Sequence, residues 1–235
     1  MQHTMRFLDR DTNGRLGRLR EQWREQLLTA LTILLALLLF VAVPLQATGI
    51  RLFQALAFVL GLTLIAGVFI LSSSRTAVGA MLFAFAMAAT AAILRLTEAS
   101  TVDVYLTAGA WLIMGVMLSG IVARAVFAPG RVTYHRVVGA VLLYLTIAVI
   151  FGSLFTFVGL LIPKAFSGIS FEDSPALAGN VTYFSFVTLT STGYGDVFPV
   201  HPMARSLCNL ETILGQLYPA TLLARLVSLE IEGRR

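Results

Sequence analysis

The chain has 235 residues, of which 57% are hydrophobic and only 12% charged, with a formal net charge of +5 at pH 7. A soluble domain typically has about 25% charged residues, so the composition excludes an ordinary soluble protein and indicates an all-α membrane protein. The basic residues are placed around apolar runs, and we expect no nucleic acid partner. The single cysteine, Cys208, excludes a disulfide within the chain and lies in a stretch typical of helix packing.

Residues 1–26 contain six arginines interleaved with acids and are interpreted as a cytoplasmic N-terminal segment. Six apolar runs follow, each close to the roughly 20 residues needed to cross a bilayer. They are expected at Leu27–Leu45, Leu52–Leu71, Ala77–Leu94, Val104–Ala123, Val137–Ile162 and Arg205–Leu229. The predicted organisation is a four-helix transmembrane domain over 27–124, a cytoplasmic linker over 125–136 and a two-helix domain over 137–235.

The basic residues predict the orientation of these helices. With both termini in the cytoplasm, 13 of the 17 Lys and Arg residues face inward and four face outward: Arg51, Arg95, Lys164 and Arg205. Cytoplasmic loops of membrane proteins are enriched in Lys and Arg. We therefore expect a multi-pass protein of the cell membrane, with the region between the last two helices on the outer side.

That outer region contains a short helical pattern. Phe171–Pro175 is typical of an exposed turn, whose acids attract cations by their field. Ala178–Leu189 is apolar but too short to span a bilayer, and we expect a re-entrant helix. Its C-terminal end carries partial negative charge, which favours a cation nearby.

The stretch Thr188–Asp196 follows this helix and places hydroxyl residues before Gly-Tyr-Gly. Irregular backbone at membrane depth occurs only where it is buried in protein or lines a water-filled path. Rings of backbone carbonyls replace the hydration shell of a cation, and glycine tolerates the left-handed dihedrals that such a backbone needs. A glycine-rich turn between two helices is the plainer alternative.

The same stretch resembles the potassium channel signature Thr-Val-Gly-Tyr-Gly-Asp, with Ser191 in place of the first Thr and Thr192 in place of Val. The resemblance implies a selectivity filter that binds K⁺, formed by Ser191, Thr192, Gly193, Tyr194 and Gly195. Support for this filter is expected from Tyr183, Phe184, Thr188, Asp196 and Glu211. Tyr183, Phe184 and Tyr194 would form an aromatic cuff around it.

The last helix looks like the inner helix of bacterial two-helix potassium channel pores. Gly215 lies where that family has a hinge glycine, and Pro219 removes a backbone hydrogen bond, which gives either a gate or a static bend. By resemblance, Gln216, Pro219 and Leu223 line the inner cavity and the cytoplasmic constriction. For Glu211 we expect a hydrogen bond to Ser185 or Thr188; a pH-sensing or ion-attracting role is the alternative.

A voltage sensor needs several arginines along its fourth helix, whereas Val104–Ala123 contains none and only Arg124 follows it. Arg95, Glu98 and Asp103 are interpreted as an outer charge cluster, and we expect little voltage dependence. One filter segment cannot surround an ion and no repeat is present, so a homotetramer is predicted. We expect a potassium-selective channel in the lipid bilayer, with K⁺ as permeant ion, no cofactor and no enzymatic activity.

Several alternatives remain open from the sequence. A weakly selective cation channel and a non-conducting subunit of a mixed tetramer keep the same fold. A secondary transporter would show repeated halves with paired broken helices, and here only the filter region is broken. An intramembrane enzyme would need paired aspartates, a His-Glu-x-x-His motif or a Ser/His pair at membrane depth, and the sequence has none of these in its helices.

Overall fold

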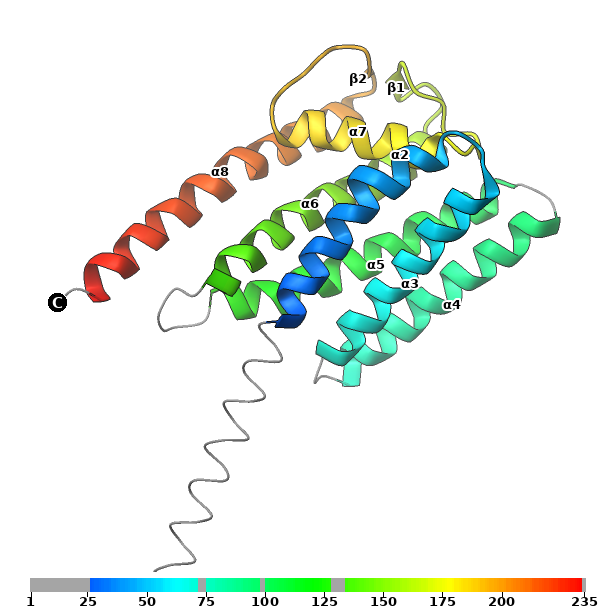
Figure 1. The fold of residues 1–235 in the computed structure, drawn as a ribbon. Helices are drawn as coiled ribbons and strands as arrows, with labels where there is room; N and C mark the ends of the chain where they lie inside the picture. The colour runs from blue at the N-terminus through cyan, green and yellow to red at the C-terminus, as the bar shows by residue number, and fades with distance from the viewer. Residues whose placement is uncertain (1–25, 72–74, 98–99, 128–133, 234–235) are drawn as a thin grey trace, which may run out of the picture.

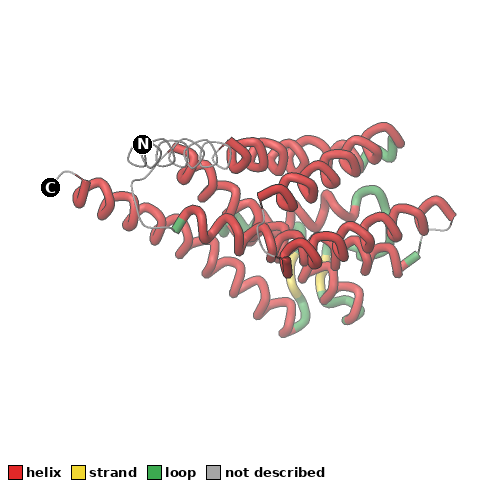
Figure 2. Tube along the Cα trace, turned by 90° about the horizontal axis from the view of Figure 1, so that it is seen from below, coloured by secondary structure: helices red, strands yellow, loops and turns green. Residues whose placement is uncertain are grey.

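The computed structural model describes residues 26–71, 75–97, 100–127 and 134–233. This part of the chain is almost entirely helical, and its strands are two short segments (Figure 2). Residues 26–46 form one helix that includes the π-helical turn η1 (Leu38–Ala42) and α2 (Val43–Gln46). The elements that follow are α3 (Arg51–Leu71), α4 (Arg75–Thr97), α5 (Thr101–Val126), α6 (Tyr134–Leu161), β1 (Phe166–Ser167), α7 (Leu177–Leu189), β2 (Phe198–Pro199) and α8 (Pro202–Gly233).

The helix over residues 26–46 lies at the centre of the main hydrophobic core. Its buried residues recur every three or four positions, which places them on one face of the helix. They pack against buried residues of the neighbouring helices: Leu31, Leu35, Leu38 and Ala42 on this helix, Leu64 on α3, Met81 on α4, Leu118 on α5 and Leu142 on α6. The core therefore joins the first four helices to α6 of the same chain.

The π-helical turn η1 directly precedes Pro44. Proline lacks a backbone N–H, and its ring excludes the carbonyl four residues earlier. A widened turn accommodates this conflict without ending the helix. The helix can therefore continue to Gln46, where its end lies against α7: the rings of Phe40 and Phe186 are 5.1 Å apart.

Four helices among the described residues are long and apolar enough to cross a membrane: Gln26–Gln46, Thr76–Arg95, Thr101–Arg124 and Arg136–Leu161. They confirm four of the six predicted runs as candidate spans. The second run does form α3, but its apolar stretch with described side chains is only Ala55–Gly67. The sixth forms α8, whose polar residues keep it out of this group. The six-span arrangement therefore stays a prediction.

Helices α6, α7 and α8 pack together around a cluster of phenylalanines. Phe184 of α7 contacts Phe155 of α6, with ring centroids 4.9 Å apart, and Phe166 of β1, at 5.5 Å. β1 pairs with β2 in antiparallel fashion, Phe166 opposite Pro199. This pairing joins the segment before α7 to the segment after the Gly-Tyr-Gly stretch.

The ends of the helices lie on two sides of the molecule. Figure 1 shows the turn between α2 and α3, both strands and the helix α7 at one end of the bundle, and the start of α6 and the C-terminal part of α8 at the other. This arrangement agrees with the predicted alternation of the helices across a bilayer. Which side faces the cytoplasm remains a prediction from the charges.

Candidate functional site

The site begins where α7 ends, in a compact hydrogen-bonded turn. The N–H of Ser191 donates to the carbonyl of Thr188 at 3.0 Å, and the N–H of Thr192 donates to the carbonyl of Val187 at 2.9 Å. These are the two bonds of a Schellman motif, which satisfies carbonyls at a helix C-terminus and needs one left-handed residue. Here that residue is Ser191, with φ of 57°, where glycine is usual.

Left-handed residues then alternate along the stretch that follows. Gly193 has φ of 59° and Gly195 has φ of 83°, whereas Thr192 and Tyr194 do not have positive φ. Alternating handedness turns successive N–H groups to one side of a chain and successive carbonyls to the other. The backbone from Ser191 to Gly195 therefore has the handedness pattern that a row of carbonyl oxygens requires.

The outer end of this stretch is held by Tyr183 of α7. Its hydroxyl donates a hydrogen bond to Asp196 Oδ2 at 2.9 Å, and its ring lies parallel to that of Tyr194, with centroids 6.3 Å apart. Two members of the expected aromatic cuff are therefore together within one chain. Phe184 points the other way, into the phenylalanine cluster, where it fixes α7 to α6.

Glu211 of α8 is fully buried behind α7, and its Oε1 lies 2.5 Å from the hydroxyl of Ser185. The contact to Ser185, one of the two predicted partners, is thus confirmed. The Ser185 hydroxyl also lies 2.8 Å from the carbonyl oxygen of Ala148 on α6. Thr188, the other predicted partner, instead donates its hydroxyl to Phe184 of its own helix.

A serine hydroxyl has a single proton, whereas a carbonyl and an ionised carboxylate only accept. An ionised Glu211 would leave one of these two contacts without a proton. A neutral Glu211 donates to Ser185, which in turn donates to Ala148, and both contacts are satisfied. Oε2 of Glu211 has no hydrogen-bond partner among the described residues, which a neutral oxygen tolerates far better than a charged one.

Three further contacts join α8 to the end of α7. A Cβ added to Gly215 would overlap the carbonyl oxygen of Leu189, so only glycine allows this approach. Thr212 donates its hydroxyl to the carbonyl of Thr188 at 3.2 Å, and Gln216 Nε2 donates to Ser191 Oγ at 2.9 Å. We call the contacts of Glu211, Thr212, Gly215 and Gln216 the α8–α7 contact. Gly215 therefore has a packing role; the hinge stays a prediction.

Pro219 and Leu223, the other expected cavity and gate residues, lie further along α8. The helix continues through Pro219 to Gly233. Both side chains are exposed in the single chain, Leu223 to 64%. Their position on an uncovered part of α8 leaves the cavity and gate roles as predictions.

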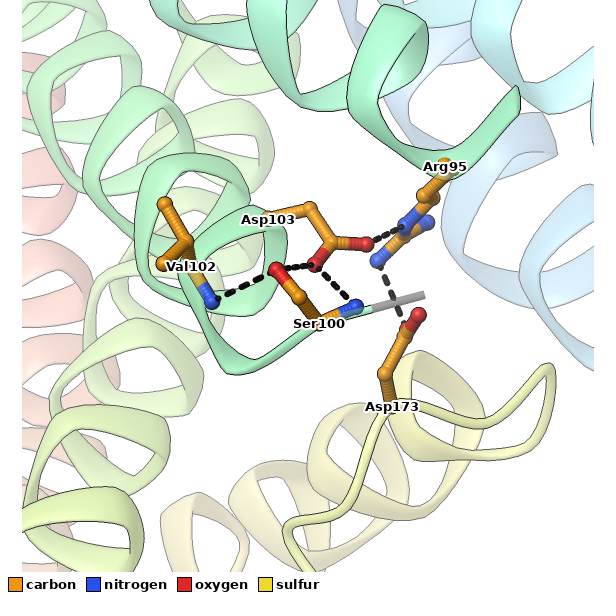
Figure 3. Close-up of polar contacts among 5 residues, drawn as sticks. All are labelled: Arg95, Ser100, Val102, Asp103 and Asp173. Atoms are coloured by element: carbon orange, nitrogen blue, oxygen red, sulfur yellow. Dashed lines mark hydrogen bonds and ion pairs between the residues drawn. The ribbon is translucent and has the colours of Figure 1, made fainter. Parts of the chain in front are cut away.

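A second polar cluster lies at the end of the four-helix domain that contacts the segment before α7, the end predicted to face outward (Figure 3). Arg95 of α4 contacts Asp103 of α5 with its Nε at 3.0 Å, and Asp173, before α7, with an η nitrogen at 3.2 Å. Asp103 is fully buried and accepts the N–H of Ser100, closing a capping box that begins α5. We call Arg95, Asp103 and Asp173 the outer ion-pair cluster.

This cluster corrects one expectation and extends another. Arg95 and Asp103 do form an outer charge cluster, while Glu98 lies outside the described residues. Asp173 is not a free acid of an exposed turn, because it shares the guanidinium of Arg95. No sequence pattern links Asp173 to Asp103 and Arg95, which lie 70 and 78 positions earlier. Among the described residues, no group of three or more His, Cys, Asp or Glu side chains is placed to hold a metal ion.

The fold is that of a helical membrane protein, with an irregular loop between α7 and α8 in which residues of positive φ alternate. Residues 139–231 match a family model described as "Ion channel". The match includes most of α6, all of α7, the Gly-Tyr-Gly stretch and nearly all of α8. It covers less than half of the chain, and it supports an ion channel family and passive ion conduction for this part. No curated protein and no solved structure gives a significant match.

Proposed function

We propose that this chain is one subunit of a potassium-selective channel with a pore formed by four identical copies. The observation that carries the proposal is the alternation of left-handed residues at Ser191, Gly193 and Gly195. Such a backbone offers successive carbonyl oxygens to one side, where they replace the hydration shell of a cation. The match of residues 139–231 to an ion channel family supports passive conduction, and the resemblance to the potassium channel signature supports K⁺.

The need for further copies is supported by what one chain leaves uncovered. A single segment cannot surround an ion, and large apolar side chains of this segment and of α8 are more than half exposed, as are others that lipid would cover on α3 and α4. Those of the filter segment and of α8 are Tyr194 at 72%, Met203 at 62%, Leu217 at 56% and Ile213 at 53%. Neighbouring copies around a fourfold axis would cover this surface and bring four filter segments together.

Potassium flux into vesicles that contain only the purified chain tests the proposal. We expect flux and a reversal potential that follows the K⁺ gradient in mixed K⁺ and Na⁺. Flux without preference for K⁺ would favour the weakly selective cation channel, and assembled protein without flux would favour the non-conducting subunit.

Gly193→Ala and Gly79→Ala form a matched pair of variants for this test. Neither added methyl group would meet another atom within 4 Å. Alanine in the left-handed conformation of Gly193 nevertheless costs about 1–2 kcal/mol, so the carbonyls should shift while the fold remains. We expect the selectivity to fall in Gly193→Ala and to stay unchanged in Gly79→Ala. Equal selectivity in both variants would contradict the assignment of the filter.

A further inference from the structure

The side chain of Gln216 contacts the first residue of the filter segment. Its Nε2 donates a hydrogen bond to the hydroxyl oxygen of Ser191 at 2.9 Å. The two residues are 25 positions apart, on α8 and directly after α7. The amide of Gln216 therefore has a specific partner at the inner end of the filter segment. The sequence alone placed this residue only on the cavity side of α8.

The backbone places Gln216 at this distance. The preceding residue, Gly215, lets α8 approach the carbonyl of Leu189 more closely than any residue with a Cβ would allow. Thr212, one turn earlier on the same face, donates to the carbonyl of Thr188 at 3.2 Å. Two contacts to backbone thus fix α8 against the end of α7, and the amide of the next residue reaches Ser191.

Ser191 needs such a partner because of its chemistry. A threonine has two heavy substituents on Cβ, which restrict χ1, whereas serine has one and rotates more freely. The backbone of Ser191 is held in the left-handed conformation by the Schellman motif, but that motif does not hold the hydroxyl. In the part of the chain that the structure describes, the hydrogen bond from Gln216 is the contact that does.

The hydroxyl keeps acceptor capacity after this bond is made. A serine oxygen has two lone pairs, and the amide of Gln216 occupies one of them. The second stays free for a cation at the inner end of the filter. The amide has no net charge, so it orients the oxygen without the repulsion that a lysine or arginine would add.

We propose that Gln216 is a specificity-determining residue, which positions the Ser191 hydroxyl as an oxygen ligand for the permeant cation at the inner end of the filter. The inference rests on the proposed potassium-conducting function. Selection between K⁺ and Na⁺ depends on the number and placement of the coordinating oxygens. A hydroxyl that rotates away removes one oxygen per subunit from that set.

The test compares Gln216→Met, Ser191→Thr and the double variant in vesicles of one lipid composition, with K⁺ and Na⁺ as the probe ions. Methionine keeps the length and unbranched shape of glutamine but has no N–H to donate. We expect Gln216→Met to lower the K⁺ to Na⁺ permeability ratio about fivefold to tenfold, the effect of one lost hydrogen bond. The added methyl of threonine should restore most of the ratio in the double variant, because it restricts χ1.

Two results would overturn the inference. The first is a wild-type permeability ratio in Gln216→Met. The second is a lowered ratio that Ser191→Thr leaves uncorrected, which would mean that Gln216 acts on the pore without positioning the hydroxyl. Gln216→Asn, whose amide is one methylene too short to reach Ser191, gives the same comparison if Gln216→Met does not assemble.

Thr90→Val is the control for loss of a polar group on a helix. Thr90 lies exposed on α4, and within the described part of the chain its hydroxyl donates to the carbonyl of Ala86 in its own helix. Its replacement should therefore leave the ratio unchanged. Failure of the proposed function gives a different result: the wild-type protein itself would then show no preference for K⁺. A selective wild type with an unaffected Gln216→Met refutes the inference alone.

Discussion

The outer ion-pair cluster and the buried Glu211 hold carboxyl groups in two different ways. In the outer cluster, one guanidinium lies between two carboxylates, and Asp103 has a further backbone donor in the capping box. Glu211 is equally buried, but among the described residues its hydrogen-bond partner is the hydroxyl of Ser185 alone. A carboxylate beside a guanidinium can remain charged, whereas a buried carboxyl without a cation is accommodated as the neutral acid.

The two carboxyl sites also belong to two different connections with α7 and the segment before it. The outer cluster ties the four-helix domain to the segment before α7 through charge, between a partly exposed Arg95 and a buried Asp103. The α8–α7 contact ties the inner helix to the end of α7 through close packing and neutral hydrogen bonds. We expect the largest effects from changes to Glu211 and Gly215 in the second connection, because both residues are buried there.

Replacement of Glu211 should have the largest effect on stability. Glu211→Ala leaves a cavity and removes the hydrogen-bond partner of the Ser185 hydroxyl, which should lower the free energy of unfolding by about 3 kcal/mol. Glu211→Gln keeps the shape and donates an amide N–H to the same hydroxyl, so its effect should stay below about 1 kcal/mol. Denaturant unfolding in micelles measures both. An equal loss in the two variants would mean that Glu211 does not act as a neutral donor.

Gly215→Ala tests the close packing in the α8–α7 contact. The added methyl overlaps the Leu189 carbonyl, and overpacking typically costs about 1–3 kcal/mol. The gain in helix propensity, about 1 kcal/mol at most, offsets only part of this. Gly120→Ala on α5 is the matched control, since no atom lies within 4 Å of the added methyl there. If both variants gain stability in the same unfolding assay, the contact is not tight.

Asp103→Ala tests the charged connection at its buried end. The change removes the acceptor of the capping box as well as the partner of Arg95, and we expect a loss of about 1–2 kcal/mol. Val102→Ala, an exposed neighbour on the same first turn, controls for the change in helix propensity. Comparable melting temperatures for the two variants would show that the outer cluster adds nothing to stability.

Asp173 should have the smallest effect at neutral pH. Burial raises the pKa of Asp173 above its ordinary value of 3.8, as does Asp103, although Arg95 acts in the opposite direction. The folded protein then binds a proton at higher pH than the unfolded chain. The contribution of Asp173 to stability therefore increases as pH falls from the raised pKa toward 3.8.

Asp173→Asn should change stability by no more than about 0.5 kcal/mol at pH 7, and it should remove this part of the pH dependence. Unfolding curves of both proteins between neutral and acidic pH measure the difference. The contrary result is a variant that is strongly destabilised at pH 7 and whose stability still increases toward acidic pH. It would show that the ion pair with Arg95 contributes more to stability than the burial of Asp173 costs.

Local sequence pattern predicted the helices and the loop well. Apolar runs located the helices to within a few residues, and the hydroxyl residues before Gly-Tyr-Gly located the irregular loop after α7. The partner of Glu211 also followed from the sequence, because a buried acid needs a polar neighbour and few were within reach. For the helices and the loop, the residues of a single stretch were sufficient for the prediction. For Glu211, the prediction followed from the cost of burying an acid without a polar partner.

The other contacts between distant segments did not follow from the sequence. How closely two elements approach decides three contacts: the close packing of Gly215 on the Leu189 carbonyl, the bond from Gln216 to Ser191 and the pairing of Arg95 with Asp173. A glycine in a helix pattern does not indicate whether it bends the helix or packs against a neighbour. Polar residues of α8 such as Thr212 and Gln216, which contact the end of α7, lower the mean hydropathy of this helix. The sequence pattern therefore indicated a membrane span less clearly here than in the other helices.

The central claim is selective K⁺ conduction through the Ser191–Gly195 segment, and the reversal potential of the purified protein tests it most directly. Vesicles or planar bilayers would hold the wild-type chain, with K⁺ on one side and Na⁺ on the other. We expect a reversal potential near the K⁺ equilibrium value in the wild type and a shift toward zero in Gly193→Ala. A wild-type reversal potential near zero under these conditions would contradict the account.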